Sequence, residues 1–454
     1  MRRASGHGWP EHQAKREPIR AVSLADDLLF NLGFLLPTAA LGAFTRSRAA
    51  AGLLTRLPLD WAAQRFVRRA RRHGGGDYLW IHLAGARALL VLDPEGIARV
   101  LERSPLEFAD GRAKREGMAR FQPGAVTISR GEDWRTRRRF NESVLATGKT
   151  HPDARGFLAI IRQEVDRARR SGGELDRWGR FEQLFRRLTL RVVLGLEPGQ
   201  ESAALDHLRA IMQESNRPAF LRPRRSRHLD PLQALLHRDL EEAGAPSLAS
   251  RCARASSTRR TRVESQVTHW LFATWETLAI NAVRALALIA AHPRIEAGVR
   301  EELAALDPAE PDDVARLLLL EGCVQEAMRL WPTTPMLVRE AAKDTTLGGE
   351  RIARRTQIVI LTAFHHRDPA RDPAAGEFRP EAWANGPPPP PLLFFGGGAQ
   401  ACAGRDLALL VAKGVLAALL GDRRHRLLTP SLNPGRPIPL TCDHFRVRFA
   451  VDRR

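Results

Sequence analysis

One stretch of the sequence decides the fold, residues 394–406: Phe394-Phe395-Gly396-Gly397-Gly398-Ala399-Gln400-Ala401-Cys402-Ala403-Gly404-Arg405-Asp406. It places a cysteine in a glycine-rich loop, and the apolar run that follows, residues 407–413, is rich in strong helix formers. Cys402 is therefore expected at or just before a helix N-terminus, where unpaired N–H groups and the helix dipole favour an anionic sulfur. The glycines tolerate positive φ and let the backbone approach a flat ligand closely.

A thiolate presented in this way is a suitable soft ligand for iron, and haem iron held by a cysteine thiolate is suited to O–O bond cleavage. Two other interpretations stay open for the loop taken by itself: an inert core cysteine, and a phosphate-binding loop. The glycines at 396, 398 and 404 do not follow the G-x-G-x-x-G spacing, and no β-branched strand leads directly into them. The choice between these interpretations depends on the rest of the chain.

The pattern Phe395-Gly396-x-Gly398-x-Gln400-x-Cys402-x-Gly404 resembles the haem loop of the cytochrome P450 monooxygenases, F-G-x-G-x-R-x-C-x-G. The resemblance extends from about residue 77 to the C-terminus. It implies haem b as cofactor, Cys402 as the metal ligand, and Phe395, Gly398 and Gln400 as cofactor-binding residues. Gln400 stands where the family usually has Arg or His for a haem propionate, and a glutamine donates a hydrogen bond there without charge assistance.

A second motif, Ala273-Thr274-Trp275-Glu276-Thr277, lies inside the long apolar helix expected over residues 268–291. An acid and an alcohol are costly to bury without partners, so one interpretation is that Glu276 faces solvent while Thr277 bonds back to the helix backbone. The stretch resembles the family's oxygen-activation motif, [A/G]-G-x-[D/E]-T. That resemblance implies that Glu276 and Thr277 are the catalytic residues and relay protons. Thr274 replaces the family's glycine.

Further cofactor-binding residues are implied by the resemblance on two other elements. Trp134 and Arg138 would lie one turn apart on one helix face, and both would reach a haem propionate. Arg339, which follows Trp331-Pro332 on an expected strand, would point at a propionate as well. The remaining arginines of residues 135–139 are expected to form a positive surface near the cysteine side of the haem.

The pair Glu326 and Arg329 is a weak signal by itself, because an exposed i,i+3 pair contributes only about 0.2–0.5 kcal/mol. The resemblance implies instead a buried ion pair that supports the haem loop. The family's third partner is the arginine of F-x-P-E-R-W, but Ala382 stands there in residues 378–383. Another basic residue is expected to replace it, or the network is weaker. The prolines of residues 387–391 are expected to form a rigid spacer.

The composition narrows the function classes. The chain has 454 residues, a formal charge of +20 and a pI near 11.2. Arginine dominates the 71 basic residues and is spread along the chain, and Tyr78 is the single tyrosine, so a concentrated basic face with stacking aromatics is not expected and nucleic-acid binding is not predicted. The four cysteines lie far apart without a C-x-x-C pair, which is compatible with a reducing cytoplasm.

The N-terminal part, residues 1–76, is expected to form a basic tail and a helical extension before a single catalytic domain at residues 77–454. Residues 28–44 are uncharged, but they number only 17 and contain Asn31 and Pro37, whereas a membrane-spanning helix needs about 20 apolar residues. A helix pair packed on the surface is expected, with peripheral membrane contact as an alternative. Residues 77–92 predict a β-hairpin that turns at Ala84-Gly85, followed by a helix capped by Asp93. Residues 105–129 and the pair His365-His366 are expected in loops.

Together these features predict a mainly α fold with a minor β region, the cytochrome P450 fold, in which a helical prism encloses haem. The function implied by the resemblance is insertion of one oxygen atom from O2 into a small organic substrate, by a cytoplasmic and monomeric protein. Electrons would come from NAD(P)H through a reductase and a separate acidic ferredoxin-type donor. Two alternatives stay open: a peroxide-dependent peroxygenase or isomerase of the same fold, motivated by Thr274, and a haem-binding protein without turnover.

Overall fold

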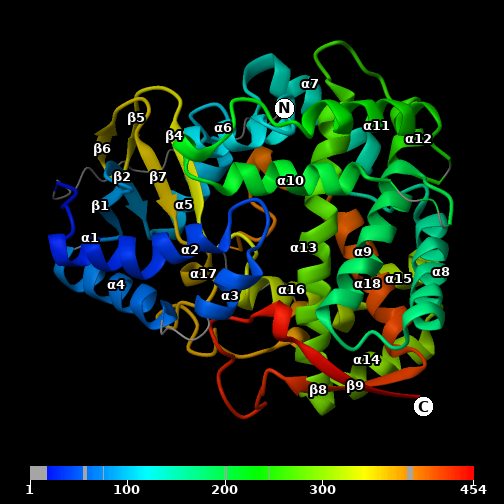
Figure 1. Cartoon of the computed structure of the whole chain (residues 1–454). Helices are drawn as coiled ribbons and strands as arrows, with labels where there is room; N and C mark the ends of the chain where they lie inside the picture. The colour runs from blue at the N-terminus through cyan, green and yellow to red at the C-terminus, as the bar shows by residue number, and fades with distance from the viewer. Residues whose placement is uncertain are drawn as a thin grey trace, which may run out of the picture.

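The computed structural model describes residues 18–54, 59–74, 76–198, 200, 202–244, 246–385 and 392–453. Helices predominate in it, as the sequence predicts (Figure 1). Their bounds are α1 Leu24–Phe30, α2 Leu36–Leu41, α3 Arg48–Leu54, α4 Leu59–Gly74, α5 Pro94–Glu102, α6 Arg112–Ala119, α7 Gly131–Leu145, α8 Ala154–Gly172, α9 Trp178–Thr189, α10 Ala204–Asn216, α11 Leu229–Glu241, α12 Leu248–Cys252, α13 Val263–Ala291, α14 Pro293–Ala305, α15 Pro311–Ala315, α16 Leu318–Leu330, α17 Thr362–His365 and α18 Arg405–Leu420.

The strands form one mixed sheet and two hairpins. The sheet has five strands in the order β1-β2-β7-β4-β3, and β2 and β7 are its parallel pair. The small sheets pair β5 with β6 and β8 with β9. The strand bounds are β1 Tyr78–Leu83, β2 Ala86–Val91, β3 Phe108–Asp110, β4 Leu337–Ala341, β5 Thr345–Leu347, β6 Glu350–Ile352, β7 Gln357–Ile360, β8 Arg423–Thr429 and β9 Arg448–Arg453.

The predicted hairpin is confirmed: β1 and β2 pair antiparallel from Tyr78–Val91 to Leu83–Ala86. Its turn has positive φ at both Ala84 and Gly85. Asp93 caps α5 by accepting hydrogen bonds from the N–H groups of Glu95 and Gly96. These local rules place α5 beside the sheet, where its end becomes a support for the cysteine loop.

The N-terminal helices pack against the sheet rather than standing apart from it. Phe30 of α1 and Phe66 of α4 share a hydrophobic cluster with Leu79 and Leu90 of the hairpin. In Figure 1, α1 and α4 run side by side along the outer side of the sheet. The expected helix pair is one continuous helical stretch, because a π-helical segment, Asn31–Leu35, joins α1 to α2. Residues 1–17 lie outside the described residues.

α13 is the central helix of the molecule, and it crosses the full height of the helical half in Figure 1. It packs against α9, α16 and α18, and its apolar residues belong to the largest hydrophobic cluster. In the part of the chain that the structure describes, two helical stretches could span a membrane by length and composition: Val263–Ala291, whose apolar 18-residue window is 67% buried, and Leu24–Leu41, which is 22% buried. The first is accounted for as the core helix of this fold.

Residues 105–129 are not simply a loop, which corrects the expectation from the sequence. They contain β3, which pairs with β4, and the helix α6. α6 shows little apolar periodicity, because Gly117 and Met118 are its only buried residues. Charge pairs stabilise it instead, such as Arg112 with Glu116 at 2.6 Å and Lys114 with Asp110 at 2.7 Å.

Candidate active site

The cysteine loop is held closed by its own backbone. The N–H of Cys402 donates a hydrogen bond to the carbonyl oxygen of Phe395 at 2.8 Å. Gly396 and Gly398 have φ values of 69° and 59°, in the left-handed region. A Cβ on Gly398 would lie 2.2 Å from the carbonyl oxygen of Leu101, at the end of α5. Gly398 is therefore required both for the backbone conformation and for the seat of the loop on α5.

Cys402 lies just before α18, whose N-cap is Gly404, as the sequence predicts. It is exposed, whereas Cys252, Cys323 and Cys442 are all buried. Burial of the surrounding loop raises the pKa of the Cys402 thiol, and a hydrogen bond from the Gly404 backbone and the charge of Arg138 act in the opposite direction. A ligand that packs against the loop requires an accessible sulfur with closely packed atoms around it. Cys402 is thus the cysteine that can bind a metal centre.

Two of the residues expected at a haem propionate keep buried atoms without a hydrogen bond among the described residues. These atoms are Oε1 of Gln400 and Nε of Arg339. Arg339 also donates from Nη1 to Asp110 at 3.1 Å. Buried polar groups are normally satisfied, so unpaired atoms mark a place for a polar partner. Nε of Arg339 is a donor and fits an ionised propionate, whereas Oε1 of Gln400 is an acceptor, so Gln400 could reach a propionate only through its NH2 group.

Arg138 reaches the cysteine loop from α7. Its guanidinium donates to the carbonyl oxygen of Ala401, next to Cys402, and its Nε donates to Glu142 at 2.7 Å. Trp134, one turn earlier on α7, is half-buried. Phe395 is half-buried in the loop itself, with its ring 5.3 Å from that of Phe394. The structure thus brings Arg138, Phe395, Gln400 and Cys402 to one loop.

Arg137 corrects one expectation about the positive surface. It is buried and donates to Ser129 Oγ at 2.5 Å and to the carbonyl oxygen of Arg260 at 2.9 Å. Its side chain therefore supports the start of α7 and is not available to a partner. Arg135 and Arg139 are exposed on the same helix. Arg405, at the start of α18, is also exposed.

The middle of α13 is accessible although both its flanks are buried. The half-buried residues there are Phe272, Ala273, Thr274, Glu276 and Thr277. The Thr274 hydroxyl donates back to the carbonyl oxygen of Trp270 at 2.7 Å. The Thr277 hydroxyl makes no hydrogen bond with any described residue. Of the two threonines, Thr277 is therefore the one with a hydroxyl left for a ligand.

Glu276 does not face open solvent, which was one interpretation of the sequence. Its Oε1 accepts a hydrogen bond from the backbone N–H of Arg46 at 3.1 Å, and the Thr45 hydroxyl lies beside the carboxylate and favours its ionised form. Burial raises the pKa of Glu276 above its ordinary value, and these two groups, with the charges of Arg46 and Arg209, counteract part of the effect. The contact with residues 45–46 could not be predicted, because no local pattern links them to α13.

The ion pair between Glu326 and Arg329 is buried, with Nε–Oε1 and Nη2–Oε2 distances of 2.5 and 2.8 Å. No third basic residue joins it among the described residues, and the expectation of a substitute for the family's arginine is corrected. The indole Nε1 of Trp383 donates to Glu326 Oε1 at 3.1 Å, and the backbone N–H of Arg379 donates to Oε2 at 2.9 Å. Two neutral donors therefore complete the hydrogen bonding of the Glu326 carboxylate.

His365 and His366 are both buried; the expectation of a loop residue is wrong for His365, which is helical, whereas His366 lies in a turn. His365 ends α17, and His366 follows it. His366 Nδ1 lies 3.2 Å from the carbonyl oxygen of Arg329, and its Nε2 accepts from the N–H of Leu393 at 2.8 Å. His366 thus connects the Glu326–Arg329 pair to the segment that leads into the cysteine loop. No group of three or more metal-binding side chains occurs within the described ranges.

A comparison with protein families matches residues 202–440 to the family described as Cytochrome P450. This span covers more than half of the chain and includes α13, the Glu326–Arg329 pair and the cysteine loop. The chain belongs to the cytochrome P450 family. The fold described above is that of a cytochrome P450, a family of haem-thiolate proteins.

Among relatives, the chain is 32% identical over 189 residues to cytochrome P450 714C2 of Oryza sativa subsp. japonica, covering 37% of this chain and 36% of that one. It is 27% identical over 341 residues to cyclooctat-9-en-7-ol 5-monooxygenase of Streptomyces melanosporofaciens, covering 68% of this chain and 72% of that one. The chain thus matches about a third of the rice relative. Because plant, animal and bacterial cytochromes P450 all match, a soluble bacterial type is not distinguished.

Solved structures show the same fold. The retinoic acid-bound cyanobacterial CYP120A1 superposes with a TM-score of 0.69 at 18% identity, covering 88% of this chain and 96% of that one. A zebra fish cytochrome P450 with abiraterone gives a TM-score of 0.68 at 20% identity, covering 86% and 99%. At these identities the likeness shows the fold alone.

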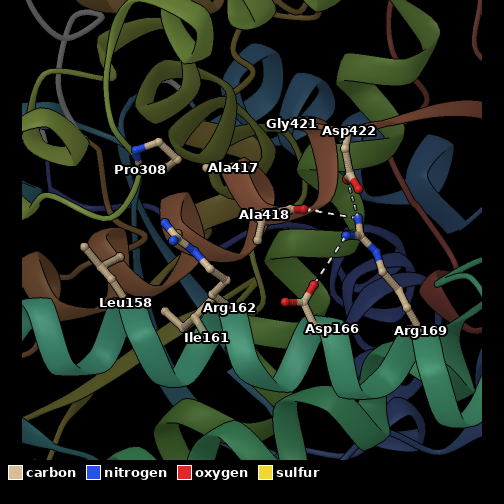
Figure 2. Close-up of a pocket in the computed structure, with 11 residues that line it drawn as sticks. Leu158, Ile161, Arg162, Asp166, Arg169, Pro308, Ala417, Ala418, Gly421 and Asp422 are labelled. Atoms are coloured by element: carbon tan, nitrogen blue, oxygen red, sulfur yellow. Dashed lines mark hydrogen bonds and ion pairs between the residues drawn. The ribbon is translucent and has the colours of Figure 1, made fainter. Parts of the chain in front are cut away.

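A separate pocket of about 270 Å³ lies between α8 and α18 (Figure 2). Leu158 and Ile161 line it from α8, and Asp166 and Arg169 form its charged end with Asp422. None of the predicted cytochrome P450 site residues lines this pocket. It is therefore not a part of the candidate active site.

Proposed function

We propose that this cytochrome P450 is a haem-thiolate monooxygenase that inserts one oxygen atom from O2 into a small organic substrate, with residues 77–454 as its catalytic domain. The observation that carries the proposal is Cys402: it is the exposed cysteine of the four, and it lies in a loop whose glycine at 398 is fixed by α5. In the overall reaction the second oxygen atom leaves as water and takes up two electrons and two protons.

Haem b, when bound, would supply the redox and oxygen chemistry. The Cys402 sulfur would hold its iron, and Gln400, Arg138, Arg339 and Trp134 would orient its propionates. Phe395 and Gly398 would shape the loop beneath it. Glu326 and Arg329 would keep this loop in place through their buried pair, which binds the backbone at residues 366, 375 and 377.

Glu276 and Thr277 would handle protons. The pKa of Glu276 is raised by burial, so its carboxyl holds a proton more readily than an exposed glutamate does. The Thr277 hydroxyl, free of any bond to the described residues, can accept a proton at Oγ1 and pass it on. Matching the pKa of an acid to the working pH is what efficient general acid catalysis requires.

An apolar substrate is supported by the residues around the accessible strip of α13. Phe121 lies between Phe44 and Phe272, with ring centroids 5.8 and 5.5 Å away. Aromatic side chains of this kind favour hydrophobic ligands.

Electrons would come from NAD(P)H through a reductase and an acidic ferredoxin-type protein. Arg135, Arg139 and Arg405 are exposed and lie on the two helices, α7 and α18, that flank the cysteine loop. A patch of positive charge near the metal ligand favours an acidic partner.

We further propose a monomeric, cytoplasmic protein that contacts a membrane surface peripherally through α1–α2. Leu24, Leu28, Leu32 and Leu36 recur every fourth residue, and their exposed fractions are 54–78%. A stripe of this kind suits the interface of a bilayer. Co-flotation with lipid vesicles tests it: wild-type protein should float and a Leu28→Glu/Leu32→Glu variant should not, and a wild-type protein that stays in the aqueous fraction would refute the membrane contact.

The monooxygenase proposal is tested by the reduced carbon monoxide complex of the purified protein. Wild type should show the red-shifted Soret band of thiolate-ligated haem, and Cys402→Ala should lose it, while Cys252→Ala, Cys323→Ala and Cys442→Ala should keep it. If Cys402→Ala retained the band, the assignment of the metal ligand would be wrong. Product formed with NADPH and redox partners, compared with peroxide, separates a monooxygenase from a peroxygenase, and neither activity would indicate a haem protein without turnover.

A further inference from the structure

Residues 42–47, here called the N-terminal strap, connect the N-terminal helices to the centre of the molecule. The strap follows α2 and precedes α3. Its backbone N–H at Arg46 donates to the carboxylate of Glu276 in the middle of α13 at 3.1 Å, and the Thr45 hydroxyl lies beside that carboxylate and favours its ionised form. The strap lies outside residues 202–440, the span matched by the family model. The acid of the candidate site therefore has its backbone hydrogen-bond donor in a part of the chain that the family match does not cover.

Asn216, the last residue of α10, fixes the shape of the strap. Its Oδ1 accepts from the N–H groups of Ala43 and Phe44, both at 2.9 Å, and its Nδ2 donates to the carbonyl oxygen of Thr45 at 2.9 Å. Gly42 has a φ of 94°, and a Cβ there would lie 2.2 Å from the carbonyl oxygen of Thr45. The strap is thus a closed turn held on three sides, and it cannot slide along α13.

The Arg46 side chain locks the strap to a second part of the site. Its guanidinium donates to the carbonyl oxygen of Gly42 within the strap and to that of Thr333, in the loop between α16 and β4. Arg46 therefore forms hydrogen bonds with three segments: the strap, the helix α13 and the loop that leads to β4.

The charged groups that face Glu276 come from two elements. Arg46 of the strap and Arg209 of α10 both favour the ionised carboxylate, and Arg284, further along α13, acts on Arg46. Arg209 also lies over the ring of Trp275, 5.0 Å from its centroid. These groups surround Glu276 on the side where the strap covers α13.

We propose that Thr45 and Arg46 are positioning residues for Glu276, so that the N-terminal strap completes the proton-handling side of the active site. This inference rests on the proposed function for its catalytic meaning, and its structural content can be tested independently. With both groups in place the carboxylate is held in one orientation against α13. Without them it would lose contacts that stabilise its ionised form and would be free to rotate.

The experiment is an infrared titration of the Glu276 carboxyl in the haem-loaded, full-length protein. A difference spectrum against Glu276→Gln assigns the band. Thr45→Val removes the hydroxyl at nearly constant shape and should raise the titration midpoint by about one pH unit, because a polar group that favours the ionised carboxylate is lost. Thr45→Ser should restore the wild-type midpoint. Ser47→Ala is the matched control, because Ser47 lies in the same strap and its hydroxyl binds the N–H of Ala50 instead.

Arg46→Gln gives a second measurement if Thr45→Val does not fold. It removes the positive charge and should also raise the midpoint, and Arg46→Lys should recover part of the shift. A Thr45→Val midpoint equal to that of wild type, or a shift of the same size in Ser47→Ala, would overturn the proposal. A shift in a protein without oxygenase activity would leave the positioning role standing and remove the proposed function. Coupled turnover without a shift in the titration midpoint would refute the positioning role and leave the proposed function standing.

Discussion

The indole Nε1 of Trp383 donates a hydrogen bond to Oε1 of Glu326 at 3.1 Å. In the family motif an arginine stands one residue before this tryptophan. Trp383→Phe removes this donor and leaves a buried carboxylate with one hydrogen bond fewer. We expect a loss of about 1–3 kcal/mol in the free energy of unfolding. Urea denaturation followed by circular dichroism measures it. Trp80→Phe is the control, because the Trp80 ring, which stacks with Arg87, makes no indole hydrogen bond to the described residues. Equal losses in both variants would contradict the role of Trp383.

Gly398→Ala should prevent the cysteine loop from seating on α5. The substitution meets a positive φ and a contact of 2.2 Å with the Leu101 carbonyl, so haem incorporation should be lost or strongly reduced. Gly396→Ala meets only the positive φ, with its nearest atom at 3.5 Å, and should incorporate haem at a reduced level. The ratio of Soret absorbance to protein measures both.

The control for these glycines is Gly179→Ala in α9, where a Cβ meets no atom within 4 Å. Alanine in a helix should raise the free energy of unfolding there by roughly 0.5–1 kcal/mol. If Gly398→Ala incorporated haem as well as Gly179→Ala, the loop would not depend on the close approach to Leu101.

Thr277→Ala should uncouple the reaction while haem content and substrate binding stay near wild type. General acid–base groups typically contribute about 10²–10⁴-fold, so product formation should fall clearly and hydrogen peroxide formed per NADPH should rise. Thr274→Ala should change coupling much less, because the Thr274 hydroxyl is bound to the carbonyl oxygen of Trp270. Peroxide and product quantified in the same reaction decide between them, and equal uncoupling in both variants would mean that Thr274 shares the relay.

Stability should fall as the pH drops from about 6.5 toward 3. Burial, together with the charge of Arg329, lowers the pKa of His366 to about 3, and burial also lowers the pKa of His365 to about 3 and of His269 to about 4. In this window the unfolded chain binds more protons than the folded one, so each buried histidine removes up to about 1.4 kcal/mol per pH unit. Urea midpoints at several pH values measure this. His366→Gln should flatten the dependence, and an unchanged slope would show that His366 does not titrate on unfolding.

Reduction by an acidic ferredoxin should slow as the salt concentration rises, because exposed charges are screened beyond about 8 Å near 0.15 M salt. Arg135→Glu, Arg139→Glu and Arg405→Glu should each slow reduction at low salt. Arg351→Glu, on the β5–β6 hairpin, is the matched surface control and should have no effect. A rate that does not depend on salt or on these arginines would contradict the proposed docking face.

The sequence predicts the parts of this site that follow from local chemistry. The glycine spacing around Cys402 anticipates a loop before a helix, and Asp93-Pro94 anticipates the start of α5. Contacts between distant segments could not be predicted in this way. The hydrogen bonds from Arg46 to Glu276, and from Trp383 to Glu326, depend on tertiary packing that no periodicity encodes.

Two further errors share a physical cause. α6 was expected as a loop because its stability comes from charge pairs rather than from an apolar stripe. Arg137 was expected on the surface because its neighbours are exposed arginines, yet its helical position turns it inward onto Ser129. In a chain so rich in arginine, residue type carries little information about burial, because a guanidinium can satisfy several backbone carbonyls at once.

The parallel pairing of β2 with β7 has a consequence for the folding of this protein during its synthesis on the ribosome. Ala88 pairs with Gln357, so most of the chain must be translated before the early hairpin finds its neighbour. Closing so long a loop is entropically unfavourable, and non-local pairing slows folding. A nascent chain that stops short of residue 357 would expose one edge of β2 to chaperones and to aggregation. Cys402 is translated later still, so the cysteine loop can form only after the strands of this sheet have been synthesised.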